Sequence, residues 1–361
     1  MLGKIPSIEG IAQIIVYAAG DQETINAVAR RIKNGPKAPT VRYHCRKLKS
    51  KGYLIERFAN RILLKLARML LIQGIPYEFA IDTNDKEIYT KREDPYIISS
   101  KAKNGTHRFV SHATLYVVLA GKRITIAFTR VREGQTREEI TKRLLKVIKN
   151  ENLSVKRIYF DRGFYSVELV QLLQRERFGA ILAMPIRGEK DGLKSRLHGK
   201  KSHWIPNYEA KTTISGKKIS AFHDVAAIAT YQKGKRRKRG VCWYAYAVIG
   251  TPISLLRVKD TYRLRFGIET SYRIKNESLG WTTSPDPEIR TLFFAIALII
   301  QNQWVCTNWF YFREHKRGRP SGKPGLPFND FRKLLIEGCL DVLGRFDEVK
   351  VKHWRKGGPF D

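Results

Sequence analysis

The sequence predicts an α/β protein in which helices flank a mixed sheet and a helical module precedes it. Strand-like and helix-like segments alternate between residues 75 and 186. Before residue 75 the apolar residues recur at helical spacing, whereas 187–257 is β-rich with little helical periodicity. The chain has 361 residues, 43% of them hydrophobic, which is enough to build a sizeable core.

The chain is strongly basic, with 68 Lys and Arg against 33 Asp and Glu and a formal net charge of +35. Such an excess repels itself unless a polyanion is nearby. Nucleic acid is therefore the expected partner, because each neutralised phosphate releases counterions. A ribosomal or architectural protein would also be basic but would rarely need so large a core.

No export signal or membrane span is expected. The apolar stretch Ile11 to Gly20 is interrupted by Gln13 and followed by charge. The longest apolar run, Leu292 to Ile300, falls well short of the ~20 residues that a membrane span needs. The four cysteines have no paired spacing, so neither a zinc site nor a disulfide framework is expected. We expect a cytoplasmic, nucleoid-associated protein.

Residues 1–74 are expected to form a helical DNA-binding domain. Apolar spacing predicts a helix over 22–33, and a second helix starts near Thr40. A short turn before a basic helix is typical of a helix-turn-helix, with a small helical bundle as the alternative. A further apolar helix is expected over 58–72. The outward residues of the second helix, which are the candidate DNA contacts, are Arg42, Arg46, Lys47 and Lys49.

A second domain is expected to begin at residue 75. Tyr77 to Asp82 is predicted to be a strand that ends on an acid, and Thr136 and Glu139 form a capping box that starts a helix. The other expected elements, in chain order, are a hairpin over 110–120 and 123–131, a strand over 155–160, a helix over 166–175 and a strand over 178–184.

This order of strand, hairpin, helix, strand, helix and strand is that of a ribonuclease-H-like domain, in which acids at strand ends meet at the edge of the sheet. Helices over 260–278 and 288–312 would return the chain to this sheet after the β-rich insertion. The expected units are the helical domain 1–74, the catalytic domain in two parts, 75–186 and 258–312, the insertion 187–257, and a basic C-terminal region, 313–361.

The segment 262–275 aligns a phenol, a guanidinium and a carboxylate. Offsets of three and four place Tyr262, Arg265 and Glu269 on one face of a helix. The carboxylate can hold a metal ion while the other two groups hold phosphate oxygens. The alternative is an amphipathic helix with a surface pair between Arg265 and Glu269.

Asp82 and Asp161 each follow an apolar strand, where a side chain leaves the core on a rigid backbone. With Glu269 they supply the hard oxygen ligands that Mg²⁺ prefers, and we expect Mn²⁺ to substitute. Two such ions would polarise both oxygens of an in-line displacement at phosphorus. The alternative is that both aspartates serve turns, and Asp85 competes with Asp82 for the catalytic role.

Three motifs, Ala-Ile-Asp82-Thr, Phe-Asp161-Arg-Gly-Phe-Tyr and Tyr262-x2-Arg265-x3-Glu269, resemble those of insertion-sequence DDE transposases with a Tyr-Arg-Glu-Lys signature. The resemblance covers residues 75–310. It implies metal-dependent cleavage of double-stranded DNA at transposon ends and attack of the freed 3′-hydroxyl on target DNA. It also implies a homodimer that holds two ends. The alternatives are a ribonuclease-H-like DNA endonuclease without strand transfer and a non-enzymatic DNA-binding regulator.

The lysine of that signature departs from the family pattern, because Asn276 stands where the spacing asks for lysine. Lys275 comes one residue early, so on an ideal helix it points about 120° away from Glu269. Arg273 lies within about 40° of Glu269 on the same helix. Arg273 and Lys275 are therefore both candidates for the DNA-binding cation.

Two further features are candidate DNA contacts. Lys316 to Pro320 resembles an AT-hook, which would insert Arg317 and Arg319 into the minor groove, and a solvated basic loop is the alternative. Core packing is the expected role of Trp204 and Trp243, with stacking on an unpaired base as the alternative.

Overall fold

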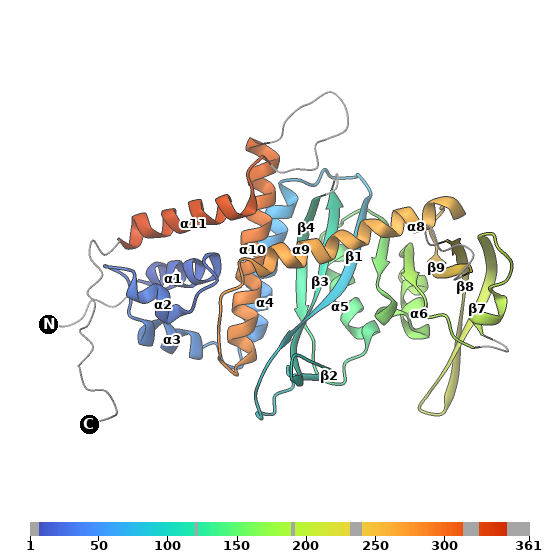
Figure 1. Ribbon diagram of the computed structural model, residues 1–361, viewed down its shortest axis with the longest axis horizontal. Helices are drawn as coiled ribbons and strands as arrows, with labels where there is room; N and C mark the ends of the chain where they lie inside the picture. Colours follow the sequence, from blue (N-terminus) through green and yellow to red (C-terminus); the bar gives the residue numbers. More distant parts are fainter. Residues whose placement is uncertain (1–6, 120–121, 189–191, 232–239, 313–324, 345–361) are drawn as a thin grey trace.

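The computed structural model describes residues 7–119, 122–188, 192–231, 240–312 and 325–344, without the side chains of 266–270. These residues form a large mixed sheet with helices on both faces and a helical assembly at one end (Figure 1). The α/β class agrees with the sequence, while the ribonuclease-H-like assignment and the domain limits stay predictions.

Within the described residues, the strands join into one sheet in the order β2-β3-β1-β5-β6-β9-β8-β7, and β4 also pairs with β3. The central strands β1, β5 and β6 are parallel, and their neighbours on both sides are antiparallel. The strands are β1 (Tyr77–Glu87), β2 (Ile98–Lys103), β3 (Thr106–Leu119), β4 (Lys122–Arg130), β5 (Val155–Phe160), β6 (Ala180–Ala183), β7 (His203–Ile214), β8 (Lys217–Thr230) and β9 (Cys242–Ile249).

The β-rich character predicted for 187–257 is confirmed, since β7, β8 and β9 all lie there. These strands extend the central sheet, because β9 pairs with β6 from Ala180↔Ile249 to Ala183↔Tyr246. Trp204 and Trp243 are half-buried and pack against the core clusters on the sheet's faces. The expected packing role of both tryptophans is therefore confirmed.

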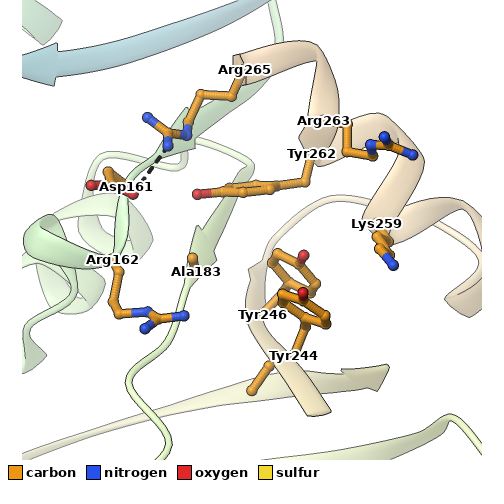
Figure 2. A pocket seen from close by; sticks show the side chains of 10 residues that line it. Asp161, Arg162, Ala183, Tyr244, Tyr246, Lys259, Tyr262, Arg263 and Arg265 are labelled. Atoms are coloured by element: carbon orange, nitrogen blue, oxygen red, sulfur yellow. Dashed lines mark hydrogen bonds and ion pairs between the residues drawn. The ribbon is translucent and has the colours of Figure 1, made fainter. Parts of the chain in front are cut away.

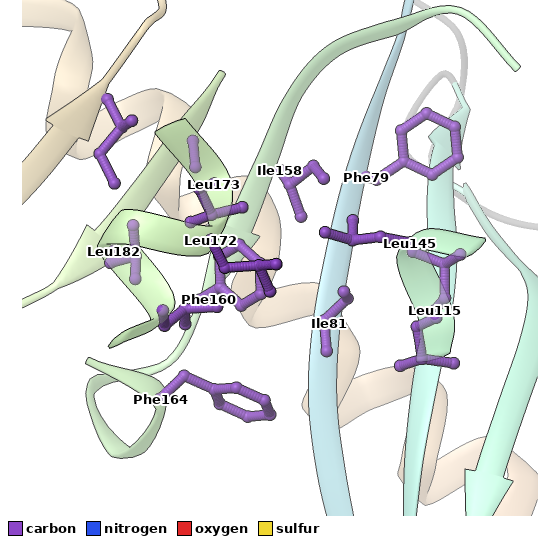
Figure 3. Packing of buried hydrophobic residues seen from close by; sticks show 14 of the residues in the cluster. Phe79, Ile81, Leu115, Leu145, Ile158, Phe160, Phe164, Leu172, Leu173 and Leu182 are labelled. Carbon is purple, nitrogen blue, oxygen red and sulfur yellow. The ribbon is translucent and has the colours of Figure 1, made fainter. Parts of the chain in front are cut away.

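One face of the sheet packs on α5 (Arg137–Asn150) and α6 (Val167–Arg175). Figure 3 shows this core, with Phe79, Ile81, Ile158 and Phe160 of the central strands among its residues. The capping box predicted at the start of α5 is confirmed, because the Glu139 amide donates to Thr136 Oγ1 and the Thr136 amide donates to Glu139 Oε2.

The other face of the sheet lies under α8 (Leu255–Arg263), the 3₁₀ segment η3 (Leu264–Phe266) and α9 (Gly267–Asn276). Because side chains alternate across a strand, Ala80 and Tyr159 belong to this second face. Val258 and Tyr262 of α8 pack on them. The functional side chains predicted from the central strands also lie on this face.

The prediction that the first strand ends at Asp82 is wrong, because β1 continues to Glu87. Only its parallel pairing with β5 stops there, at Ile81↔Phe160. The antiparallel pairing of β1 with β3 continues to Glu87↔Phe109. The polar residues after Asp82 hid this continuation, because they do not show the apolar alternation of a strand.

The helices at one end of the molecule come from the N-terminal and C-terminal parts of the described chain. The helices predicted over 22–33, near 40 and over 58–72 are present with shifted limits, and α4 begins earlier and packs between α10 and β4. The helix-turn-helix assignment stays a prediction. The helices of this part are α1 (Ile8–Gly20), α2 (Ile25–Arg30), α3 (Ala38–Arg46), α4 (Gly52–Arg68), α10 (Pro287–Tyr311) and α11 (Phe328–Leu343).

α11 lies in the region expected only to be basic, and it packs along α1. The Asn34 amide donates to the Leu343 carbonyl, and the Arg332 side chain donates to the Gly20 carbonyl. The basic composition of 313–361 concealed the apolar residues that α11 buries, Phe328, Phe331 and Leu340 among them.

Among the described helices, α10 is the one that is long and apolar enough to cross a membrane by length and composition. It packs against α4, β4 and α1. Buried Asn302 accepts from the Thr125 amide of β4 and donates to the Thr125 carbonyl. These contacts are those of a core helix, as the short apolar run predicted.

Candidate active site

Asp82 and Asp161 lie side by side on the face of the sheet that α8 covers. They directly follow Ile81 and Phe160, the last pair in the parallel ladder between β1 and β5. The Asp161 side chain is 46% exposed and that of Asp82 is 17% exposed. Two strands thus bring together acids that are far apart in the sequence, one largely buried and one open to solvent.

Arg265 bridges the two acids. Its Nη1 donates to Asp82 Oδ2 over 3.2 Å, and its Nη2 donates to Asp161 Oδ1 over 3.1 Å. Figure 2 shows the Arg265 side chain reaching from its ribbon segment to Asp161. Because one guanidinium spans both carboxylates, their oxygens are close enough to share a single cation.

Burial sets the protonation of Asp82. Loss of solvent raises the pKa of this carboxyl from 3.8 to about 6, against the lowering effect of Arg265 and of the Thr83 amide. The nearby negative charge of Asp161 raises the pKa further. Any additional cation placed beside Asp82 would therefore stabilise its ionised form.

The prediction of one continuous helix through Tyr262, Arg265 and Glu269 is wrong, although the Arg265 guanidinium still lies 5.5 Å from the centre of the Tyr262 ring. The α-helix is interrupted there, so that Tyr262 lies in the last turn of α8, Arg265 lies in η3 and Glu269 lies in α9. Arg265 reaches the acids from the 3₁₀ segment. The side chain of Glu269 is outside the described part of the structure, so its role as a third ligand stays a prediction.

Tyr262 forms part of the wall beside the acid pair. Its ring is buried against Tyr159 and Tyr246, and its hydroxyl donates to the Phe160 carbonyl over 3.0 Å. Figure 2 shows the ring lying between Arg265 and Tyr246. This hydrogen bond holds the end of α8 against the last residue of β5, immediately before Asp161.

Lys275 is buried, whereas Arg273 is exposed. The Lys275 ammonium donates to Asn84 Oδ1 over 3.0 Å and lies 4.3 Å from the centre of the Phe294 ring. Burial lowers the pKa of Lys275 well below its usual value. Of these two candidates, Lys275 is therefore the one that α9 directs toward β1, even though ideal helix geometry measured from Glu269 favoured Arg273.

Asp85 is not part of this face. Side chains alternate along β1, and Asp85 accepts a hydrogen bond from the Ser111 hydroxyl over 2.6 Å. Asn84, by contrast, shares the face of Asp82 because it is two residues further along the strand. Strand alternation could have identified Asn84 from the sequence, if β1 had been extended beyond Asp82.

Tyr272 is a site residue that the sequence did not single out. Its hydroxyl lies 2.6 Å from Thr114 Oγ1 and donates to the Asp82 carbonyl over 3.3 Å. Together with Lys275, it fastens α9 to β1 and β3 beside the first acid. Tyr272 is three residues before Lys275, so helical spacing could have placed the two side chains on the same face of α9.

A pocket of about 560 Å³ opens beside Asp161. Its lining includes basic groups from both sides of the opening, so positive charge surrounds the exposed acid (Figure 2). A phosphodiester placed here would have cations within reach of its oxygens. The basic lining residues are Arg162, Lys259, Arg263 and Arg265.

The two acids suit a divalent ion in chemistry and placement. Carboxylate oxygens are the ligands that Mg²⁺ prefers, and both acids already share one cationic group. The residues with described side chains contain no group of three His, Cys, Asp or Glu arranged to hold a metal. The side chain of Glu269, the third ligand expected from the sequence, lies outside that set.

The predicted N-terminal contacts lie on the surface of α3 and just beyond it. On the opposite side of α3, Val41 and Cys45 are buried. The basic residues Arg42, Arg46, Lys47 and Lys49 are all exposed. Arg317 and Arg319 lie outside the described residues.

No protein-family model and no curated protein matches this chain. Among solved structures, the cryo-electron microscopy structure of a piggyBac transposase synaptic complex with hairpin DNA is similar, with 11% identity and a TM-score of 0.49. The match covers 74% of this chain and 53% of that one, so it spans about half of the longer protein. A likeness this distant carries no argument about chemistry, which has to be inferred from the residues themselves.

Proposed function

We propose that the protein is a DNA transposase that cleaves phosphodiesters at transposon ends and transfers the freed 3′-hydroxyl to target DNA, with Mg²⁺ or Mn²⁺ as cofactor. The observation that carries the proposal is the pairing of Asp82 with Asp161 through Arg265. The net charge of +35 supports a nucleic-acid substrate.

Asp82 and Asp161 would hold the ion, with Glu269 of α9 as the third ligand. The bound ion would polarise the phosphodiester and activate the attacking oxygen. Arg265 holds the two carboxylates together until then and offsets their mutual repulsion. The basic lining of the pocket would hold the non-bridging phosphate oxygens, with Arg162 and Arg263 nearest to solvent.

Joining of strands separates this function from simpler ones. The test uses a duplex selected from a random pool for binding to the full chain, prepared with a pre-cleaved 3′-hydroxyl end, and a supercoiled plasmid as target. We expect joined products with Mg²⁺ from the native chain. Cutting without joining would favour the endonuclease, and binding without either reaction would favour the regulator.

Two matched variants make the test specific to the acid pair. Asp161→Asn should retain DNA binding and lose cleavage and joining by at least about a hundredfold, since it removes a metal ligand. Asp85→Asn makes the same chemical change on the opposite face of β1 and should retain both reactions. Full activity in Asp161→Asn would overturn the enzymatic assignment.

A further inference from the structure

A second basic pocket lies at the other end of α8. It has a volume of about 330 Å³ and includes Lys156, Arg157, Arg257 and Ser254 in its lining. Arg157 and Tyr159 lie on the same face of β5, two positions apart, and Asp161 follows two positions later, directly after the strand. This pocket therefore shares the sheet face of the acid pair.

Arg157 is buried, with its side chain only 8% exposed, yet its hydrogen-bonding capacity is not used up. Among the described residues, its Nε and Nη1 atoms have no hydrogen-bond acceptor. The Glu78 carboxylate is at ion-pair distance, 3.5 Å from Nε. Buried donors without acceptors are costly, and their presence in a pocket wall points to an anionic ligand.

The N-terminus of α8 meets the same pocket. Its N-cap residue, Ser254, makes no capping hydrogen bond with its side chain. The first-turn amides and the helix dipole therefore add positive potential where Ser254 and Arg257 line the pocket. A helix N-terminus beside buried and exposed arginines is a favourable setting for a phosphate group.

The charges of the lining favour an anion even though one acid is present. Lys156 Nζ lies 3.4 Å from Glu78 Oε1, so Glu78 offsets part of the local positive charge. Arg157 and Arg257 leave the lining net positive. A phosphate is suited to this arrangement because a guanidinium can donate to it with two N–H groups.

We propose that the N-terminus of α8, with Arg157 and Arg257, is a second phosphate-binding site whose occupant is a backbone phosphate of the bound DNA. α8 has 9 residues, so about 14 Å separates its N-terminus at this site from its C-terminal end at the pocket beside Asp161. That length corresponds to about four nucleotides along one strand. The lining of the pocket and the helix N-terminus support a phosphate ligand, whereas the assignment of that phosphate to DNA rests on the proposed function.

The first arm of the test uses inorganic phosphate as the probe. Its affinity for the metal-free full chain is measured by calorimetry on the native protein, Arg257→Gln and Lys146→Gln. Lys146 is an exposed residue of α5 and gives the same change in charge on the other face of the sheet. We expect about a tenfold loss of affinity in Arg257→Gln, since a charge-assisted hydrogen bond is removed, and no loss in Lys146→Gln.

Arg157→Met is the second variant in this arm and should weaken phosphate binding at least as much. Arg157 is buried, so this variant can fail to fold. Arg257 is exposed, so Arg257→Gln tests the proposal in a chain that folds. Equal phosphate affinities in Arg257→Gln and Lys146→Gln would overturn the site.

The second arm identifies the source of the phosphate. The dependence of DNA affinity on salt should weaken by about 0.9 in log–log slope in Arg257→Gln and stay unchanged in Lys146→Gln. An unchanged slope together with lost phosphate binding would overturn the DNA assignment in favour of a free phosphate compound. Neither arm requires cleavage, so an inactive native chain that still showed both effects would refute the proposed function and leave this site intact.

Discussion

Ile81 and Phe160 are the last partners in the parallel ladder between β1 and β5, and each is followed directly by an acid. Asp82 and Asp161 therefore lie at the same level and on the same face of the sheet. A slip of one residue between the strands would turn one acid to the opposite face. The candidate site thus depends on strand register as much as on the identity of its residues.

Removing the guanidinium that bridges the two acids should raise the pKa of Asp82. In Arg265→Met the two carboxylates face each other without the cation that bridges them, so we expect the pKa of Asp82 to rise above about 6. Direct measurement is by nuclear magnetic resonance titration of the Asp82 carboxyl in metal-free buffer. Arg263→Met removes a charge from the exposed end of α8 and serves as the control. A lower pKa in Arg265→Met would contradict the bridging role.

Lys275 and Arg273 should differ in their effects on strand transfer. Lys275→Met removes the ammonium that donates to Asn84 beside the acid pair, so we expect at least about a tenfold loss of activity. Arg273→Met changes an exposed side chain of the same helix and should stay within about twofold. Both are read as initial rates of joining at saturating DNA. The reverse ranking would restore Arg273 as the functional cation.

Stability should fall in acid because of His112. Burial, aided by the positive charges of Lys275 and Arg130, holds the pKa of His112 well below its ordinary value. As pH drops through about 6.5, the unfolded chain takes up a proton that the folded state does not, so the free energy of unfolding decreases. This contribution is fully present above that pH and is lost below it.

His112→Gln removes the linked proton. The native protein should therefore lose up to about 2 kcal/mol relative to the variant between pH 8 and pH 5. Urea unfolding of both proteins at the two pH values gives the comparison. Since other titrating groups cancel in this difference, a gap that does not change with pH would show that the pKa of His112 is the same in the folded and unfolded chains, which would contradict the prediction.

Asn302 should be a stability residue. It pairs with both backbone groups of Thr125, so Asn302→Ala leaves a buried amide and a buried carbonyl without partners. We expect a loss of about 3 kcal/mol in the free energy of unfolding. Gln303→Ala, at the exposed neighbouring position on α10, should change it by less than about 0.5 kcal/mol. Similar values for the two variants would show that β4 does not depend on this contact.

The basic surface of α3 should contribute to DNA binding. Replacing Arg46 and Lys47 together by Gln should reduce the log–log salt slope by about 1.8 if each contacts one phosphate. The matched control replaces Lys142 and Lys146, which are exposed on α5, by Gln. Equal slopes for the two double variants would show that the basic residues of α3 contribute no more to DNA binding than other surface charges do.

Some of the architecture was readable from local sequence. The capping box of Thr136 and Glu139 predicted the start of α5, and the strand predicted over 155–160 matches β5 to the residue. Both signals concern neighbours in the chain, where backbone conformation and hydrogen bonding are set locally. α11 and the second half of β1 were missed because their partners, α1 and β3, are remote or lie after them in the chain.

The sequence by itself determined which chemistry is available: a basic chain, acids that follow apolar strands, and a segment that carries Tyr262, Arg265 and Glu269. Only the tertiary structure decided how those groups are arranged. In the structure, η3 interrupts the segment, Arg265 contacts both aspartates, and Lys275 is buried and donates to Asn84. The physical reason is that the face a side chain presents depends on what packs against its helix, and here β1, β3 and α10 select the buried side of α9.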